Sequence, residues 1–220
     1  MISEKGGMIL KIIIIEADGN CDISDYMKYI SAERRERAAR IRSDRDRILS
    51  VTAELAVRRE IITELGMKNQ DISFDYGEHG KPFLHGRSDF HFSFSHSGKY
   101  IALVCSRENA GIDIERKDRG NEKIARRYFT GDEYSRIYGN TGQNLSFAEV
   151  WTSKEAYIKY TGEGLSRGLN TFSVLDGSTG CRFERFDLDE YTVTVCTESE
   201  DEIYCEIIKS EEIYEFFRNI

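Results

Sequence analysis

Two carboxylates stand one residue apart in Gly111-Ile112-Asp113-Ile114-Glu115. Alternation of apolar and polar residues is typical of a strand, so Asp113 and Glu115 are expected on one face and the isoleucines on the other. Adjacent carboxylates repel unless a cation or water lies between them, and such oxygen ligands suit Mg²⁺. The alternative is an ordinary strand whose polar face meets water.

A second group of charged residues lies in a segment expected to be helical, residues 144–160. Glu155 and Lys159 would lie in one row with Trp151, at four-residue steps. Glu155 could complete a metal site with the two strand carboxylates, and Lys159 could contact a phosphate one turn further on. The alternative is a routine Glu–Lys pair on a helix surface.

A lysine on a rigid turn, Gly80-Lys81-Pro82, and the segment Ser95-His96-Ser97 both suit phosphate oxygens. All four histidines of the chain fall between residues 79 and 96. They lack a compact chelating pair and no cysteine joins them, so we expect no zinc site. No nucleophile elbow accompanies His96, which argues against a serine hydrolase.

Arginines crowd residues 34–47 of a chain whose formal net charge is −8. They are Arg34, Arg35, Arg37, Arg40, Arg42, Arg45 and Arg47. A basic patch on an acidic protein favours a compact anionic ligand, and the net charge argues against general nucleic-acid binding. The alternative is a solvated helical face on which these arginines pair with the interspersed acids.

The elements that must position these residues follow from hydrophobic periodicity and turn signals. Helices are expected from near 31, at 43–66, 121–128, 131–138 and 144–160, and after 210; strands are expected at 8–16, 72–76, 91–95, 100–105, 112–115, 171–175, 182–187, 191–197 and 203–208. We expect the strands after 175 to complete the second sheet. This order permits two similar α+β halves joined near 106–110.

Composition is that of a soluble globular protein, with 40% hydrophobic and 32% charged residues. No apolar run is long enough to span a membrane. The five cysteines are odd in number and include no Cys-x-x-Cys pair. Since no export signal is visible, we expect reduced thiols and a cytoplasmic location.

Taken together, the motifs resemble those of the surfactin-type (Sfp-type) 4′-phosphopantetheinyl transferases. In order they are Gly80-Lys81-Pro82, Phe92 to Gly98, Gly111 to Glu115, and Trp151-x-x-Lys154-Glu155-Ala156-x-x-Lys159-x-x-Gly162-x-Gly164-Leu165. Ser31 to Arg37 is similar to the basic N-terminal stretch of that family. The resemblance covers residues 9–175.

The resemblance implies an α+β pseudodimer of two similar halves, each an antiparallel-rich sheet packed with helices. Residues 1–107 and 108–220 would form the halves, with coenzyme A in the cleft between them. The implied activity moves 4′-phosphopantetheine from coenzyme A to a serine of an acyl or peptidyl carrier protein and releases adenosine 3′,5′-bisphosphate.

The resemblance also implies roles for individual residues. Asp113, Glu115 and Glu155 would hold Mg²⁺, or Mn²⁺, against the pyrophosphate. Glu155, directly or through a metal-bound water, would be the base for the carrier serine, Lys159 would stabilise the leaving group and Lys154 would assist. The implied coenzyme A-binding set is Arg34, Arg37, Lys81, Pro82, Ser95, His96 and Lys159, with the lysines on the pyrophosphate and Arg34, Arg37 and His96 near the 3′-phosphate and adenosine.

A carrier protein that presents an acidic helix would dock on a surface with apolar and basic residues, and Ile124 to Phe129, which includes Arg126 and Arg127, has that character. We expect a monomer, because both halves of the cleft lie in one chain, and neither nucleic-acid nor membrane partners. Two other functions stay open: a non-catalytic module that binds coenzyme A or a nucleotide, and a nucleic-acid-binding helix over residues 31–47.

Overall fold

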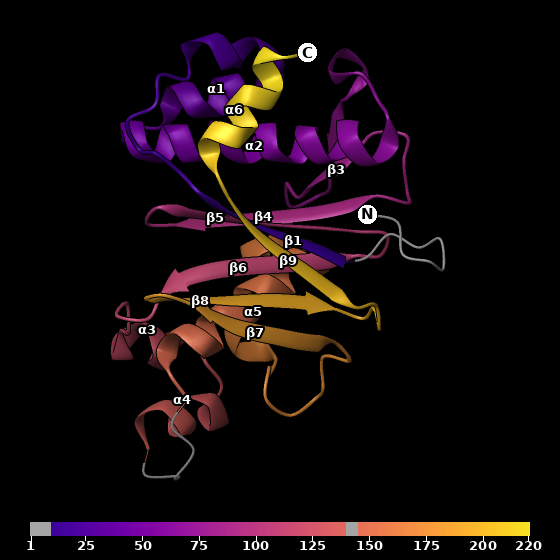
Figure 1. The fold of residues 1–220 in the computed structure, drawn as a ribbon. Helices are drawn as coiled ribbons and strands as arrows, with labels where there is room; N and C mark the ends of the chain where they lie inside the picture. Colours follow the sequence, from indigo (N-terminus) through magenta and orange to yellow (C-terminus); the bar gives the residue numbers. More distant parts are fainter. Residues whose placement is uncertain (1–9, 140–144) are drawn as a thin grey trace.

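The computed structural model describes residues 10–139 and 145–220, arranged as two sheets packed face to face with helices outside each (Figure 1). The four-stranded first sheet has the order β4-β5-β1-β9. Its strands are β1 (Leu10–Glu16), β4 (His91–Ser97), β5 (Tyr100–Ser106) and β9 (Ile203–Lys209). Only β1 and β9 pair in parallel. Residues 8 and 9 of the expected first strand lie outside the described residues.

The second sheet has three antiparallel strands in the order β6-β8-β7. They are β6 (Ala110–Arg116), β7 (Arg182–Leu188) and β8 (Tyr191–Thr197). A short hairpin of β2 (Phe74–Tyr76) and β3 (Pro82–Leu84) stands apart from both sheets. The fold class predicted from the sequence, α+β with two sheet-and-helix halves, is confirmed.

Helices cover the outer face of each sheet. On the first sheet lie α2 (Asp44–Leu65) and α6 (Ser210–Arg218), with α1 (Ala32–Arg40) beside α2. On the second lies α5 (Phe147–Thr161), with which α3 (Glu122–Tyr128) and α4 (Gly131–Tyr138) pack (Figure 1). Residue 144, the expected start of the long helix, lies outside the described residues. A capping box at Ser146 begins α5, and Gly162 in the left-handed conformation ends it. In the described part of the chain no helix is long and apolar enough to cross a membrane.

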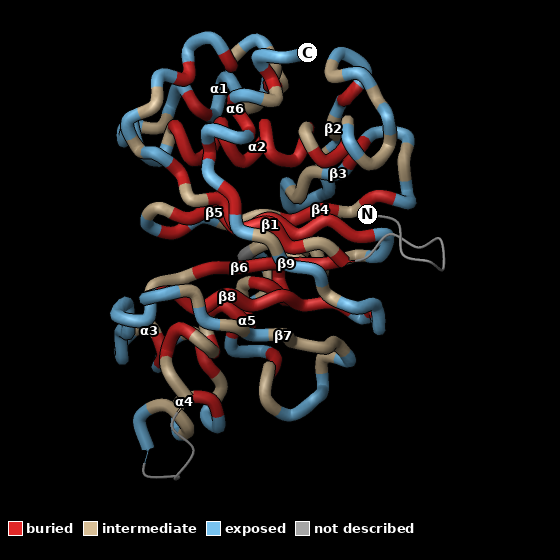
Figure 2. The backbone as a smooth tube through the Cα atoms, in the orientation of Figure 1, coloured by how far each residue is buried: buried red, intermediate tan, exposed pale blue. Residues whose placement is uncertain are grey.

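Alternation along the strands gives each sheet two buried faces (Figure 2). Ile12 and Ile14 of β1 pack between the sheets with Val193 and Val195 of β8. Ile13, on the opposite face of β1, packs with the apolar residues of α2. Each Å² of apolar surface buried between the sheets contributes about 25 cal/mol, and this burial holds the two halves together.

Two expectations about the C-terminal part are wrong. Although β7 and β8 do complete the second sheet, β9 pairs with β1 in the first. The following helix α6 packs on α2, where the hydroxyls of Thr52 and Tyr214 lie 2.6 Å apart, so residues 203–218 lie with the N-terminal half. The expected strand at 171–175 does not form, because Leu169 and Phe172 turn their carbonyl oxygens toward the ammonium of Lys154.

Candidate active site

The two sheets meet along β4 and β6, each an edge strand of its own sheet. Serines of β4 bond the carboxylates of β6 across this seam. The Ser95 hydroxyl donates to Oδ1 of Asp113 at 2.6 Å, and the Ser97 hydroxyl donates to Oε1 of Glu115 at 2.7 Å. The period of two thus places hydroxyls from one half opposite carboxylates from the other.

Helix α5 packs directly on β6 at Gly111. A Cβ atom at this position would lie 2.0 Å from the carbonyl oxygen of Ala156, so only glycine permits the approach. The same packing brings Lys159 to the strand, where its Nζ lies 2.6 Å from Oδ1 of Asp113. The contact between the strand motif and the helix motif therefore depends on a residue without a side chain at Gly111.

Glu155, one turn before Lys159, lies near enough to Asp113 for the two charges to interact. Its pKa is raised above the usual range by burial and by the charge of Asp113, and Lys159 opposes the shift. Asp113 itself is buried, with 6% of its surface exposed. A buried carboxylate with a shifted pKa is a candidate functional group.

Among residues 10–139 and 145–220, no three His, Cys, Asp or Glu side chains converge as a ready-made metal site. Asp113 is engaged by Lys159 and Ser95, and Glu115 by Ser97 and, at 3.7 Å, by Arg119. The donors are nevertheless all oxygens, and Asp113 and Glu155 repel each other. This chemistry fits a hard divalent cation, and Mg²⁺ needs only one or two protein carboxylates when phosphates supply other ligands.

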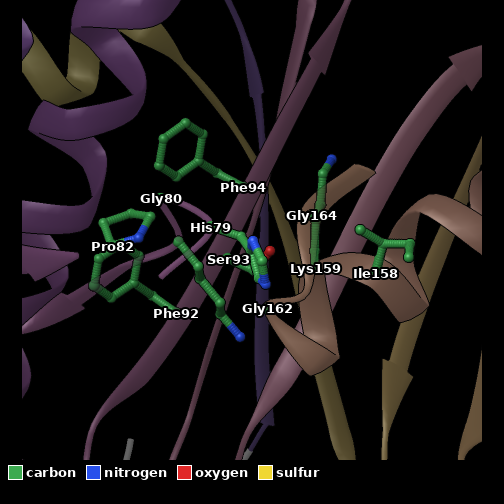
Figure 3. Close-up of a pocket in the computed structure, with 11 residues that line it drawn as sticks. His79, Gly80, Pro82, Phe92, Ser93, Phe94, Ile158, Lys159, Gly162 and Gly164 are labelled. Carbon is green, nitrogen blue, oxygen red and sulfur yellow. The ribbon is translucent and has the colours of Figure 1, made fainter. Parts of the chain in front are cut away.

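A cavity of about 240 Å³ opens beside these groups (Figure 3). Its walls come from both halves. The residues lining it are His79, Gly80, Lys81, Pro82, Phe92, Ser93, Phe94, Ile158, Lys159, Gly162 and Gly164. Phenylalanine and proline rings thus stand opposite a lysine of α5, which suits a ligand with a flat apolar part and an anionic part.

Lys81, on the turn of the β2–β3 hairpin, lines the cavity and is itself largely screened from water. This burial lowers the pKa of its ammonium to about 8. The ammonium donates to Oδ1 of Asn109 at 2.8 Å and to the carbonyl oxygen of Tyr160 at 3.2 Å. Asn109 is a residue that the motif comparison missed, and only its place beside Gly111 in the linker between the halves could have drawn attention to it.

His96 lies in β4 with its side chain open to solvent, yet surrounding protein atoms displace enough water to lower its pKa. Lys159 and Arg34 lower the pKa further, while Asp46 and Asp113 oppose them. His96 therefore stands among charged groups from both halves, as a ligand contact in the cleft would.

The two predicted arginine contacts differ in their surroundings. Arg34 is mostly buried: Nε donates to Glu54 at 3.2 Å, Nη1 donates to Ser50 at 3.1 Å, and the guanidinium lies over the ring of Phe94 at 5.3 Å. Arg37 is exposed and lies over the ring of Tyr76 at 5.0 Å. Arg34 approaches the cavity through Phe94, whereas Arg37 flanks the hairpin.

Glu54 fixes Arg34 and was missed by the sequence analysis. It is buried, accepts hydrogen bonds from the backbone N–H and hydroxyl of Ser31 at 2.6 and 2.9 Å, and pairs with Arg34 and Arg58. A carboxylate inside an otherwise apolar stretch of α2 was the available signal, because buried acids are nearly always paired.

Lys154 does not line the cavity and is fully buried. Its ammonium donates to the carbonyl oxygens of Leu169 and Phe172, both at 2.7 Å, and pairs with Glu133 at 2.8 Å. All three N–H donors are engaged within the C-terminal half. Its contacts are therefore with the structure that supports the site.

A two-half α+β fold with carboxylates, hydroxyls and lysines at the seam suits a transferase that acts on phosphate groups, and comparison with known proteins shows which class it is. Residues 109–211 match the model of the 4′-phosphopantetheinyl transferase superfamily, and residues 19–108 match that of the 4′-phosphopantetheinyl transferase N-terminal region. A "4′-phosphopantetheinyl transferase" of Bacillus subtilis is 33% identical over 83% of this chain and 88% of its own.

Two further relatives have similar coverage. The "4′-phosphopantetheinyl transferase Sfp" of Bacillus subtilis strain 168 is 30% identical, and the "4′-phosphopantetheinyl transferase ffp" of Bacillus subtilis is 32% identical, each over 80% of this chain and 85% of the relative. The chain belongs to the Sfp-type 4′-phosphopantetheinyl transferases. It is an enzyme that moves the 4′-phosphopantetheinyl group from coenzyme A to a carrier protein, as the sequence analysis predicted.

Proposed function

We propose that this enzyme performs the transfer at the seam of β4, β6 and α5, with coenzyme A in the adjoining cavity. The observation that carries the proposal is the 2.6 Å contact of Lys159 with Asp113, since it joins the helix motif to the strand motif at the cavity edge. Lys159 would move from the carboxylate to an oxygen of the pyrophosphate when coenzyme A binds.

In the proposed reaction the hydroxyl oxygen of a carrier serine attacks the β-phosphorus of coenzyme A. A new phosphorus–oxygen bond forms, the bond to the bridging oxygen breaks, and adenosine 3′,5′-bisphosphate leaves. Glu155 would accept the serine proton. Lys159 faces the negative charge that grows on the leaving phosphate.

Asp113, Glu115 and Glu155 are the residues that would hold Mg²⁺, or Mn²⁺ in its place. A divalent ion there supplies charge neutralisation on the pyrophosphate. A cation held by Asp113 would weaken the ion pair between Asp113 and Lys159, which would free the Lys159 ammonium for a phosphate oxygen.

The remaining predicted contacts are assigned to the ends of coenzyme A. Pro82 and Phe94 offer apolar surfaces for adenine, with Lys81, Ser95 and His96 beside the phosphates. Arg34 and Arg37 would meet the 3′-phosphate, a compact dianion suited to guanidinium groups. Lys154 would assist only by holding α5 in place.

The carrier protein is proposed to dock on α3, where Arg126 and Arg127 are exposed. Arg126 pairs with Glu122 at 2.8 Å and lies over the Tyr134 ring at 4.7 Å, so its position is preset. We further propose that the enzyme is monomeric and cytoplasmic.

The test incubates several apo-carriers with the enzyme, coenzyme A and Mg²⁺ and measures the carrier mass. We expect addition of one phosphopantetheine group. For Glu155→Gln we expect a loss of about 10²–10⁴-fold in rate, with coenzyme A binding weakened but not abolished. The control Glu215→Gln alters an exposed carboxylate of α6 that pairs with Arg218 at 3.9 Å and should keep the rate. A Glu155→Gln enzyme with full activity would show that Glu155 is not the base.

The docking surface is tested by the double variant Arg126→Glu/Arg127→Glu. An unchanged KM for the carrier protein would refute α3 as the docking surface.

A further inference from the structure

Three segments of the chain meet at the C-terminal end of α5, apart from the carboxylate group. They are the hairpin turn with Lys81, the linker with Asn109, and the last turn of α5 with Tyr160. Lys81 donates to Oδ1 of Asn109 at 2.8 Å, and Nδ2 of Asn109 donates to the Tyr160 carbonyl at 2.6 Å. The same carbonyl accepts from Lys81 at 3.2 Å. We call these three hydrogen bonds among Lys81, Asn109 and Tyr160 the triangle.

The chemistry of Tyr160 and Asn109 explains these hydrogen bonds. The carbonyl of Tyr160 is among the last four of the helix, which have no partner within it, and the C-terminal end of a helix favours a cation. A side-chain amide offers an acceptor and a donor together. Asn109 can therefore bind the ammonium of Lys81 with one atom and the helix end with the other.

Two glycines allow the hairpin turn to lie against the helix end. Gly162 and Gly164 have positive φ, and a Cβ on them would lie 3.3 Å from Cδ of Lys81 and 3.0 Å from Cβ of His79. All four residues line the cavity in which coenzyme A is placed. The triangle therefore holds one wall of that cavity against another.

We propose that Asn109 is a positioning residue for coenzyme A binding, which fixes Lys81 and the hairpin turn at the cavity wall. An ammonium has three N–H donors, and two are given to protein oxygens here. The third remains for a phosphate oxygen of a ligand in the cavity that Lys81 lines. This inference rests on the proposed function, because it requires coenzyme A in that cavity.

The electrostatics agree with this geometry. Burial disfavours the charge on Lys81, and its hydrogen-bond partners Asn109 and Tyr160 are uncharged, so no carboxylate competes for the ammonium at these contacts. A phosphate that reaches it meets a cation with little water to displace. Asn109 can orient this cation without neutralising it, which an aspartate in the same place would do.

The test measures steady-state kinetics and calorimetric binding of coenzyme A for Asn109→Ala and Asn109→Asp. Both should raise the KM and Kd for coenzyme A by about tenfold, with kcat within about twofold, the first by freeing Lys81 and the second by pairing with it. Asn109→Asp nearly preserves the shape, so it keeps the test usable if Asn109→Ala folds poorly. Asp75→Asn, which breaks only the exposed Asp75–His85 contact of the same hairpin, is the matched control.

A double-mutant cycle separates positioning from general support. If Asn109 acts through Lys81, then Asn109→Ala should add less than about twofold to the Kd in a Lys81→Met background. Independent, multiplied effects, or a Kd within twofold of wild type for both single variants, would overturn the inference. Wild-type enzyme that binds no coenzyme A would instead defeat the proposed function, so the two failures are distinguishable.

Discussion

Lys154 and Lys159 stand five residues apart on α5, and each pairs with a carboxylate, yet their surroundings are opposite. Lys154 and its partner Glu133 have no exposed side-chain surface, and the ammonium is bonded to three oxygens at 2.7–2.8 Å. Lys159 keeps 26% of its side chain exposed and touches Asp113 at the edge of a cavity. Five residues is nearly one and a half turns, so one helix presents a closed ion pair on one side and an open one on the other.

The difference separates support from chemistry. The closed pair has no donor left for a ligand and fastens α4 and the 169–174 segment to α5, where Glu133 also accepts from the backbone N–H of Val174 at 2.9 Å. In the open pair, the Lys159 ammonium can exchange Asp113 for a phosphate. In the proposed site, the closed pair would hold α5 rigidly while Lys159 faces the substrate.

Lys154→Met tests the closed pair and should have the largest effect. Removal of one member leaves Glu133 buried without its counter-charge, which costs about 3–5 kcal/mol of unfolding free energy. The midpoint of thermal unfolding should fall by about 6–20 °C for a chain of this size. Lys99→Met, which removes an exposed pair with Glu16, is the control and should cost under about 1 kcal/mol. Equal losses for the two variants would erase the distinction between closed and open pairs.

Lys159→Met tests the open pair and should chiefly lower activity. We expect kcat/KM for coenzyme A to fall by about 10²-fold, because the cation proposed to face the leaving phosphate is lost. Unfolding free energy should change by only about 1–2 kcal/mol, since Asp113 keeps the Ser95 hydroxyl. Calorimetry and a carrier-loading assay on the same preparation measure both. A variant that is strongly destabilised yet fully active once folded would mean that Lys159 has the role assigned to Lys154.

This contrast was only partly visible in the sequence. The periodicity of two at Asp113 and Glu115 and of four at Glu155 and Lys159 follows from local backbone geometry, and the structure brings Lys159 onto Asp113 as that spacing permits. Lys154 belongs to the same motif, but the sequence of the motif does not show which groups Lys154 contacts. Its burial depends on α4 and on the segment after α5, which are tertiary partners.

The return of β9 to the first sheet was equally hidden. A parallel pair between β1 and β9 joins residues almost 200 positions apart, and no local pattern encodes such a pairing. The expected strand at 171–175 failed for a related reason. Its apolar residues suit a strand, but the demand of the buried Lys154 for carbonyl oxygens outweighs that preference.

Lys81 adds a third case to the comparison of Lys154 with Lys159. It is partly buried and makes its hydrogen bonds to uncharged oxygens instead of a carboxylate. Its effect, a pH dependence of coenzyme A binding, should be the smallest of the three. Its pKa of about 8 lies below the usual value, so the free enzyme loses this charge as the pH rises through 8. If the charged form binds coenzyme A, the Kd should rise by about fourfold between pH 7 and pH 8.5. The pKa of the nearby Cys196 thiol is raised well above this window, and that of His96 is lowered below it. Calorimetric titration of wild type and Lys81→Met across this range measures the slope, which should flatten in the variant. An identical slope in both would assign the pH dependence to another group and leave Lys81 with the supporting role of Lys154.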